Sequence, residues 1–299
     1  MKKHSIGDIV FTTVNTLILT LLTIMCVYPM LYVAFASFSN PSAFSVHQGL
    51  LWKPLGFTIE GYRLVFENPS ILSGYANTVF YVVAGTLINL FFTCLGAFGF
   101  SRKNLLLGWP LFMLVLFTMY FGGGLIPSYL NIKNLGMLNT RWSLLIPGAV
   151  STYNMVVMRT AFMSIPASLE ESAKIDGANE FVVLTRIILP LSKATLAVIA
   201  LYYAVGHWNS WFSAMIYLRN RNLYPLQTIL REILMTDDLQ SMSNVSSVVE
   251  GDTGGVFTYQ ARQLVKYCTI IVATLPVLCV YPFAQKYFVR GVMIGAVKG

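Results

Sequence analysis

Charged residues are scarce in this 299-residue chain, in which Asp, Glu, Lys and Arg together fill 11% of the positions. In soluble globular proteins about a quarter of all residues are charged, so a water-soluble fold is not expected here. Hydrophobic residues reach 56%, and the mean hydropathy is +0.66. The length therefore limits the number of membrane spans rather than the number of soluble domains.

Residues that build metal centres, disulfides and phosphate sites are also few. The three histidines, His4, His47 and His207, are too few to supply a zinc or di-iron centre. The four cysteines fall in apolar stretches without C-x-x-C spacing, which indicates small core residues rather than a disulfide. No Gly-Lys pair occurs, so the phosphate-binding loop G-x-x-x-x-G-K-[ST] is absent. We expect no catalytic residue, metal or cofactor on this chain.

The apolar sequence divides into six stretches that can cross a bilayer. The predicted spans cover about residues 9–35, 75–100, 105–126, 142–164, 192–217 and 267–287. Pro29 is expected to kink or end the first, and Pro147-Gly148 to bend or interrupt the fourth. A signal peptide is the alternative for the first stretch, but its apolar part far exceeds the roughly 7–15 residues of a signal core. We expect an all-α polytopic membrane protein with one transmembrane domain over residues 1–299.

Basic residues favour the cytoplasmic face of a membrane protein and so predict its orientation. If the N-terminus is inside, the cytoplasmic side carries eleven basic and five acidic residues. The external side carries nine basic and seven acidic residues. Both termini are then cytoplasmic, and residues 218–263 form an external loop. Membrane topology thus explains the isoelectric point near 9.3, which gives no reason to expect a nucleic-acid partner.

The polar segment 165–191 lies on the predicted cytoplasmic side and carries strong helix signals. Pro166 suits the first turn of a helix over residues 166–175, and the acidic residues that follow stabilise its N-terminal end. Gly177 stands where a helix that ends in a left-handed residue favours glycine, and Asn179 can cap a second helix. The segment predicts a helix, a tight glycine turn and a helix.

Two other interpretations of segment 165–191 are an ordinary cytoplasmic hairpin and a DNA-reading helix-turn-helix. The segment has four carboxylates against Lys174 and Arg186, whereas duplex DNA requires a basic face. Charge therefore disfavours the DNA-binding interpretation.

The spacing in this segment resembles the E-A-A, G, I-x-L-P signature of ABC importer permeases. Glu171-Ser172-Ala173 is followed after three residues by Gly177, after nine more by Ile187, and then by Leu189-Pro190. Ser172 replaces the first alanine, a small-for-small change. The rest is similar to the carbohydrate-uptake branch, the relatives of the maltose permeases, and to its oligosaccharide subgroup in Gram-positive bacteria. That likeness rests on Asn154, Arg159, the run from Phe162 to Ala178, the run from His207 to Trp211, and the ending from Tyr287 to Gly299.

The resemblance implies a type I ABC importer permease fold in the bacterial cytoplasmic membrane. It implies five partners: a second homologous permease, two cytoplasmic ATPase subunits that carry ATP and Mg, an extracellular solute-binding protein, and an oligosaccharide cargo. Segment 165–191 would be the coupling element, in which Glu171 forms an ion pair with the ATPase and Ala173 lets the helix seat closely. The coupling interface is predicted to comprise Glu170, Glu171, Ala173, Lys174, Asp176, Gly177, Leu189 and Pro190.

A second group of residues lies near the end of the fifth predicted span and suits a sugar path. Tryptophan faces stack on sugar rings and amides bond to hydroxyl groups, whereas an aromatic belt with Asn209 bonding between helices is the alternative. For Tyr153 and Asn154, helix packing is the favoured interpretation. The predicted path comprises His207, Trp208, Asn209, Trp211, Tyr153 and Asn154.

Three other classes of function compete with the importer. A secondary transporter or channel working without ATP needs ionisable residues deep in the spans, where only His207 occurs. A membrane-embedded enzyme needs paired carboxylates or a metal cluster, and the adjacent Asp237 and Asp238 are better explained as a solvated loop. A structural membrane partner is the third. Only the importer requires a nucleotide-binding subunit to copurify.

Overall fold

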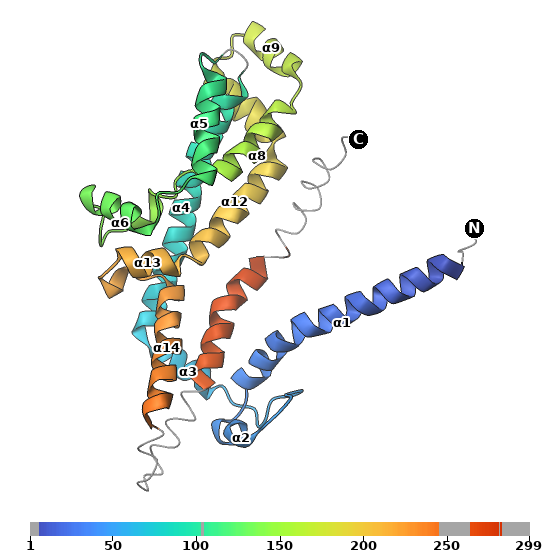
Figure 1. Ribbon diagram of the computed structural model, residues 1–299, viewed down its shortest axis with the longest axis vertical. Coiled ribbons are helices and arrows are strands. Elements are labelled where there is room, and N and C mark those ends of the chain that lie inside the picture. The colour runs from blue at the N-terminus through green and yellow to red at the C-terminus, as the bar shows by residue number, and fades with distance from the viewer. Residues whose placement is uncertain (1–5, 103–104, 245–263, 281, 283–299) are drawn as a thin grey trace. The chain divides into compact units, whose positions relative to one another are not determined.

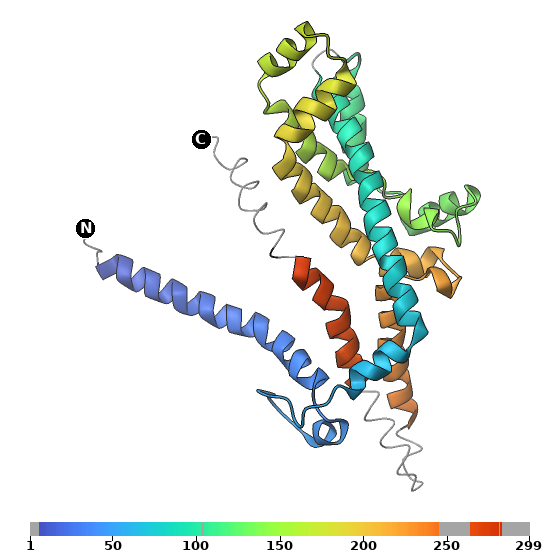
Figure 2. The same ribbon diagram turned by 180° about the vertical axis from the view of Figure 1, so that it is seen from behind.

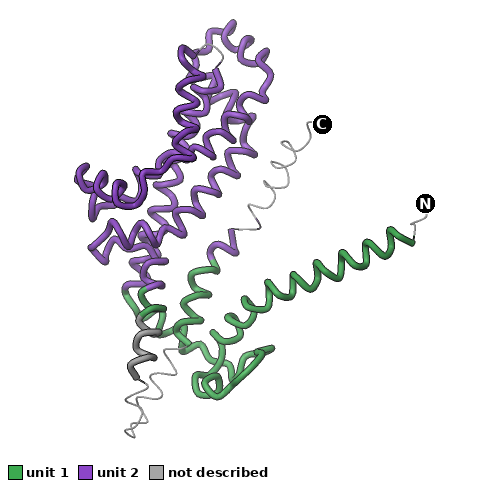
Figure 3. Tube along the Cα trace, in the orientation of Figure 1, with its two compact units in different colours: residues 1–69, 232–275 green, residues 70–231, 276–299 purple. Residues whose placement is uncertain are grey.

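The computed structural model describes residues 6–102, 105–244, 264–280 and 282 (Figure 1). Within these ranges the regular elements are helices, joined by turns and loops, and one isolated β-bridge joins Ser39 and Phe57. The chain divides into two compact units (Figure 3). The first comprises residues 1–69 and 232–275, and the second comprises residues 70–231 and 276–299. The all-α prediction is thus confirmed for the described residues.

The first unit contains three labelled helices and most of a fourth. They are α1 (Ile6–Ser37), α2 (Pro41–Val46), α3 (Glu60–Glu67) and the helix Leu264–Val280, which belongs to this unit up to Leu275. The part of α14 (Leu226–Asn244) from Glu232 onward also belongs to this unit. Buried Ala36, Phe44, Leu51 and Leu264 form its core around the end of α1. The rest of α1 is exposed and apolar, as a membrane helix is. Pro29 does not end α1, which continues to Ser37.

The second unit is organised around α4 (Pro69–Ser101), a helix of 33 residues that runs the length of this unit (Figure 2). At 1.5 Å per residue it is about 50 Å long, more than the roughly 30 Å of a bilayer core. The other helices that lie wholly or mainly in this unit are α5 (Gly108–Tyr120), α6 (Leu125–Asn134), α7 (Trp142–Leu145), α8 (Thr152–Met163), α9 (Ala167–Ile175), α10 (Glu180–Val182), the π-helix η1 (Val183–Ile188), α11 (Leu189–Leu191), α12 (Lys193–Trp208), α13 (Trp211–Tyr217) and the 3-10 helix η2 (Arg221–Leu223), and α14 (Leu226–Asn244) begins here.

Two described helices, α1 and α4, are each long and apolar enough to cross a membrane, and they match the first two predicted spans. The number rises to four if two bent pairs each count as one span. One is α5 with α6, bent by 116° where Gly122-Gly123-Gly124 ends the third predicted span, and the other joins Glu180–Leu191 to α12 at 86°. The fourth predicted span is interrupted between α7 and α8 at Pro147-Gly148, as expected.

The last two predicted elements differ from the structure or lie partly outside it. Residues 218–263 were expected to form a loop, yet α14 occupies 226–244. Leu226, Ile229 and Leu230 are buried on its first turns, at a helical spacing that the surrounding polar residues obscured in the sequence. The sixth predicted span is helical from Leu264 to Val280. Residues 281 and 283–299, including the ending from Tyr287 to Gly299, lie outside the described residues.

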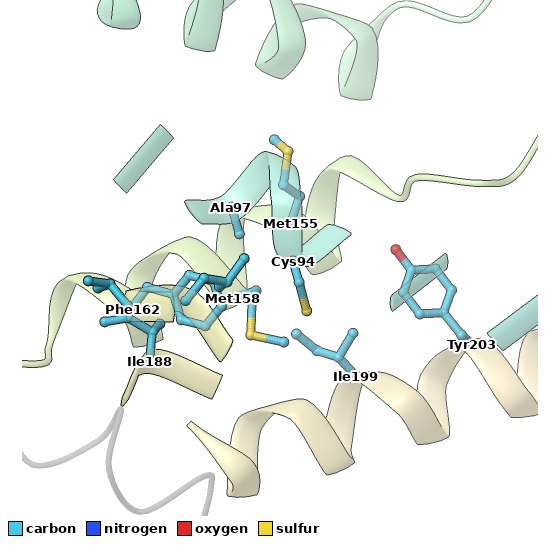
Figure 4. Packing of buried hydrophobic residues seen from close by; sticks show 10 residues of the cluster. Cys94, Ala97, Met155, Met158, Phe162, Ile188, Ile199 and Tyr203 are labelled. Carbon is cyan, nitrogen blue, oxygen red and sulfur yellow. The ribbon is translucent and has the colours of Figure 1, made fainter. Parts of the chain in front are cut away.

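One hydrophobic cluster holds the second unit together near segment 165–191 (Figure 4). Its buried members come from α4, α8, η1 and α12, which therefore pack as one body. They are Cys94, Ala97, Met155, Met158, Phe162, Val183, Leu184, Ile188, Ile199 and Tyr203. Burying a side chain of this size contributes roughly 1.5–3 kcal/mol. The cluster thus makes a rigid base for the hairpin described next.

Candidate functional site

Segment 165–191 folds as a helix, a glycine turn and a second helical arm, as the sequence predicts. Pro166 precedes α9, and the backbone N–H groups of Gly177 and Ala178 donate to the carbonyls of Lys174 and Ala173 at 3.1 and 2.9 Å. This pattern closes the helix through a left-handed residue, and Gly177 has φ +83°. The side chain of Asn179 accepts from the N–H of Val182 at 2.9 Å and caps the second arm.

The second arm contains a π-helix that the sequence does not predict. η1 occupies Val183–Ile188 between two short α-helical turns, and Pro190 follows it within α11. Proline has no N–H to donate, so an ordinary α-helical ladder cannot continue through this position. The chain bends by 86° between Glu180–Leu191 and α12. This bend aims the hairpin away from the axis of α12.

The hairpin, meaning residues 165–191, packs against the hydrophobic cluster rather than hanging from it. Val183, Leu184 and Ile188 are buried members of the cluster, while Ala173 and Leu189 are partly buried against it. Ala173 was expected to seat the helix against a partner, but its methyl group faces the chain's own core. The hairpin therefore packs with α4, α8 and α12 as one body.

A charged pair ties α9 to the end of α4. Arg102 donates from both terminal nitrogens to the carboxylate of Glu170, and its guanidinium lies 4.2 Å from the centre of the Phe98 ring. The side chains of Arg102 and Glu170 are only 21% and 16% exposed. Such a two-point bond fixes orientation as well as distance. Glu170, predicted at the coupling interface, is thus engaged within the chain.

A second ion pair joins the two arms, with Lys174 Nζ 2.5 Å from Glu180 Oε1. Both side chains are about half exposed, so the pair contributes at most about 1 kcal/mol. The outward surface of the turn is left to Glu171, Asp176 and Ile175, which is 87% exposed. This exposed set, two carboxylates beside an isoleucine, is available to a partner, as are the exposed side chains of Leu169, Phe181 and Leu191 elsewhere in the hairpin.

In the structure, the residues of the predicted sugar path fall into groups with different contacts. Asn89 on α4 donates to the carbonyl of Gly148, so its amide oxygen is left to accept a hydrogen bond from Nε2 of His207 at 2.6 Å. Asn209 donates to the carbonyl of Val205 in its own helix at 3.0 Å. The polar groups of His207 and Asn209 are therefore used in holding helices together or ending one.

A neighbouring bond continues this helix-to-helix contact. The hydroxyl groups of Thr93 and Tyr203 lie 2.7 Å apart, and the N–H of Ser151 donates to the Tyr203 oxygen at 3.0 Å. Asn154 is only 6% exposed, while Tyr153 is 54% exposed. Among the predicted path residues, packing thus accounts for Asn154 and His207 better than cargo contact does.

The two tryptophans of the predicted path are placed differently. Nε1 of Trp208 is buried without a hydrogen-bond partner among the described residues, and the ring of Trp211 lies 3.7 Å from the guanidinium carbon of Arg231. No local sequence pattern points to Arg231, Asn89 or Arg102, because each contacts a residue distant in the chain.

Comparison with known proteins gives the family. No family model matches the chain. The permease protein YtcP of the polygalacturonan/rhamnogalacturonan transport system of Bacillus subtilis (strain 168) is 39% identical over 283 residues, which cover 94% of this chain and 96% of YtcP. Protein LplC of the same strain is 39% identical over 290 residues, 97% and 95% of the two chains. The chain belongs to the permeases of ABC carbohydrate importers.

A solved structure agrees with this family. The crystal structure of a bacterial ABC transporter involved in the import of the acidic polysaccharide alginate matches with a TM-score of 0.86 and 32% identity, over 96% of this chain and 100% of that chain. The present ABC permease is therefore an integral membrane protein and the transport component of a larger complex. The roles of its hairpin and of Trp208 and Trp211 stay predictions, because family membership alone does not assign them.

The contact between α4 and α12 in this ABC permease gives a first prediction. A Cβ at Gly85 would overlap the imidazole of His207, so Gly85→Ala must displace the bond to Asn89. We expect a loss of about 1–3 kcal/mol, as for an overpacked core. Gly99→Ala is the matched control, because it lies in the same helix with no atom within 4 Å of its Cβ. The thermal midpoint of the purified complex should fall for Gly85→Ala and stay unchanged or rise for Gly99→Ala.

Proposed function

We propose that this permease crosses the cytoplasmic membrane six times, has both termini in the cytoplasm, and couples to a separate ATPase through residues 165–191. The observation that carries the proposal is the construction of the hairpin. Its inner face packs into the hydrophobic cluster, whereas Glu171, Ile175 and Asp176 are exposed at its turn. A rigid element with an exposed charged and apolar tip suits the transmission of a partner's movement.

The proposed assembly pairs this chain with a second homologous permease, two cytoplasmic ATPase subunits and an extracellular solute-binding protein. ATP and Mg are held by the ATPase subunits, and this chain binds no cofactor. Closure of the ATPases would push the hairpin, and through the cluster would tilt α4, α8 and α12 together. The cavity between the two permeases would then open outward to receive cargo, and hydrolysis would return it inward. Family membership favours this scheme over an ATP-independent transporter.

The proposed cargo is an oligosaccharide. Two similar proteins support this, since YtcP belongs to a polygalacturonan/rhamnogalacturonan transport system and the solved ABC transporter is involved in the import of alginate. In this chain, Trp208 and Trp211 are the aromatic rings that a sugar would contact. In the proposed topology, segment 218–263 is external, on the side from which a binding protein would deliver cargo.

Site-specific cross-linking tests the proposed coupling. A photoreactive amino acid at Ile175, which is 87% exposed, should cross-link to the ATPase in the complete transporter. The same amino acid at Trp52, which is 68% exposed on the proposed external side, is the control and should not. ATP-dependent oligosaccharide uptake is measured in the same proteoliposomes. A transporter that is active but cross-links to the ATPase from position 52, or not from position 175, contradicts the proposal.

A further inference from the structure

Arg231 on the first turns of α14 is held in an unusual way. Its guanidinium carbon lies 3.7 Å from the centre of the Trp211 ring, and Nε is buried without a hydrogen-bond partner. Thr228, one turn earlier, donates from its hydroxyl group to the carbonyl of Trp211 at 3.4 Å. α13 and α14 therefore hold the arginine and the tryptophan face to face.

No described carboxylate neutralises this arginine. The ion pairs among the side chains that the structure describes are Arg63 with Glu67, Arg102 with Glu170, and Lys174 with Glu180. Arg141 stacks on Phe80 in a similar way, but it also donates to the amide oxygen of Asn77. A partly buried guanidinium that lacks a counter-charge is costly, and its contact with the Trp211 ring offsets only part of that cost, so a further partner is expected.

The chemistry of the pair indicates what it binds. A guanidinium presents a planar fork that matches a carboxylate, and the indole on which it lies can border the apolar side of a sugar ring. A sugar acid carries both features in one ring, and a neutral sugar carries only the second. Arg231 also lies in the segment that the proposed topology places on the side from which cargo arrives.

We propose that Arg231 and Trp211 form a subsite that recognises the carboxylate of an acidic oligosaccharide as it enters the transporter. Arg231 would bind the carboxylate of a uronic acid unit, while Trp211 orients the guanidinium and borders the sugar ring. This inference rests on the proposed function, which it narrows from oligosaccharides in general to those built from sugar acids. It explains the feature that packing does not, a guanidinium charge with no counter-charge among the described residues.

Paired substrates test the subsite in proteoliposomes that contain the complete transporter and its binding protein. The probes are an oligogalacturonate, an oligomannuronate from alginate, and the carboxyl-reduced neutral form of each. We expect wild-type transporter to favour the acid forms at low concentration. Arg231→Gln should lower the ratio of acid to neutral uptake roughly tenfold or more, as the loss of a charge-assisted hydrogen bond does. Arg231→Lys, which keeps the charge without the fork, should give an intermediate ratio.

Arg219→Gln is the matched control, because Arg219 is an exposed basic residue in the same segment and its ratio should stay at the wild-type value. An unchanged ratio in Arg231→Gln overturns the subsite while ATP-dependent uptake keeps the proposed function. An equal fall in acid and neutral uptake also overturns it, since that result assigns Arg231 to packing. If Arg231→Gln does not assemble, Arg231→Lys and Trp211→Phe decide the matter by the same ratio. ATP-independent uptake, or none, in wild type refutes the proposed function instead.

Discussion

A transporter with Gly177→Val should assemble in the membrane and lose most of the cargo-stimulated hydrolysis of ATP. Gly177 has φ +83°, and a β-branched residue in the left-handed region costs about 1–2 kcal/mol. No atom lies within 4 Å of the added Cβ, so the cost is in the backbone and not in a clash. The turn can relieve that strain only by changing the angle between its two arms. We expect stimulation by cargo-loaded binding protein, measured as the ATPase rate of the reconstituted complex, to fall about tenfold.

The chain offers a closely matched control for this prediction. Gly136 follows α6 with φ +68°, and no atom lies within 4 Å of its Cβ either. Gly136→Val should therefore impose a similar backbone cost outside the hairpin and leave coupling intact. Normal coupling in Gly177→Val would remove the turn from the mechanism. Equal uncoupling in both variants would show a general loss of stability.

The local part of the hairpin could be predicted from sequence because its signals act over a few residues. Pro166 begins α9, Gly177 adopts the left-handed conformation, and Asn179 caps the second arm, each within one turn of the feature it determines. The interruption at Pro147-Gly148 was predictable for the same reason. The family also followed from spacing in this region, since the signature spans only residues 171–190.

Contacts between distant residues could not be predicted in this way. Arg102 and Glu170 are 68 residues apart, and Asn89 and His207 are 118 apart, so no local pattern joins them. Hydropathy also fails to distinguish a lipid-facing side chain from a buried one, because both are apolar. The sequence likewise does not show whether Ala173 faces a partner or the chain's own core, and polar neighbours obscure the buried residues of α14. The π-helix η1 depends on how the ladder adjusts around Pro190, which composition does not reveal.

The ion pair between Arg102 and Glu170 gives the other large expected effect. Arg102→Met should leave the Glu170 carboxylate, 16% exposed, without its partner and remove the contact with Phe98. Breaking a fully buried pair costs about 3–5 kcal/mol, and partial exposure reduces this to roughly 2 kcal/mol. We expect a lower thermal midpoint together with weaker ATPase stimulation. Arg63→Ala is the control, because the pair with Glu67 is 79% and 56% exposed and should matter by less than about 0.5 kcal/mol.

A double variant separates stability from coupling at this pair. Arg102→Met with Glu170→Leu removes both charges, and replacing a whole buried pair with apolar side chains is often neutral or stabilising. The thermal midpoint should then return to near the wild-type value. Coupling should stay weak, because the bidentate bond that fixes α9 against the end of α4 is absent. If ATPase stimulation recovers along with the midpoint, the pair only stabilises the fold, and movement must pass from the hairpin to α4 through the hydrophobic cluster alone.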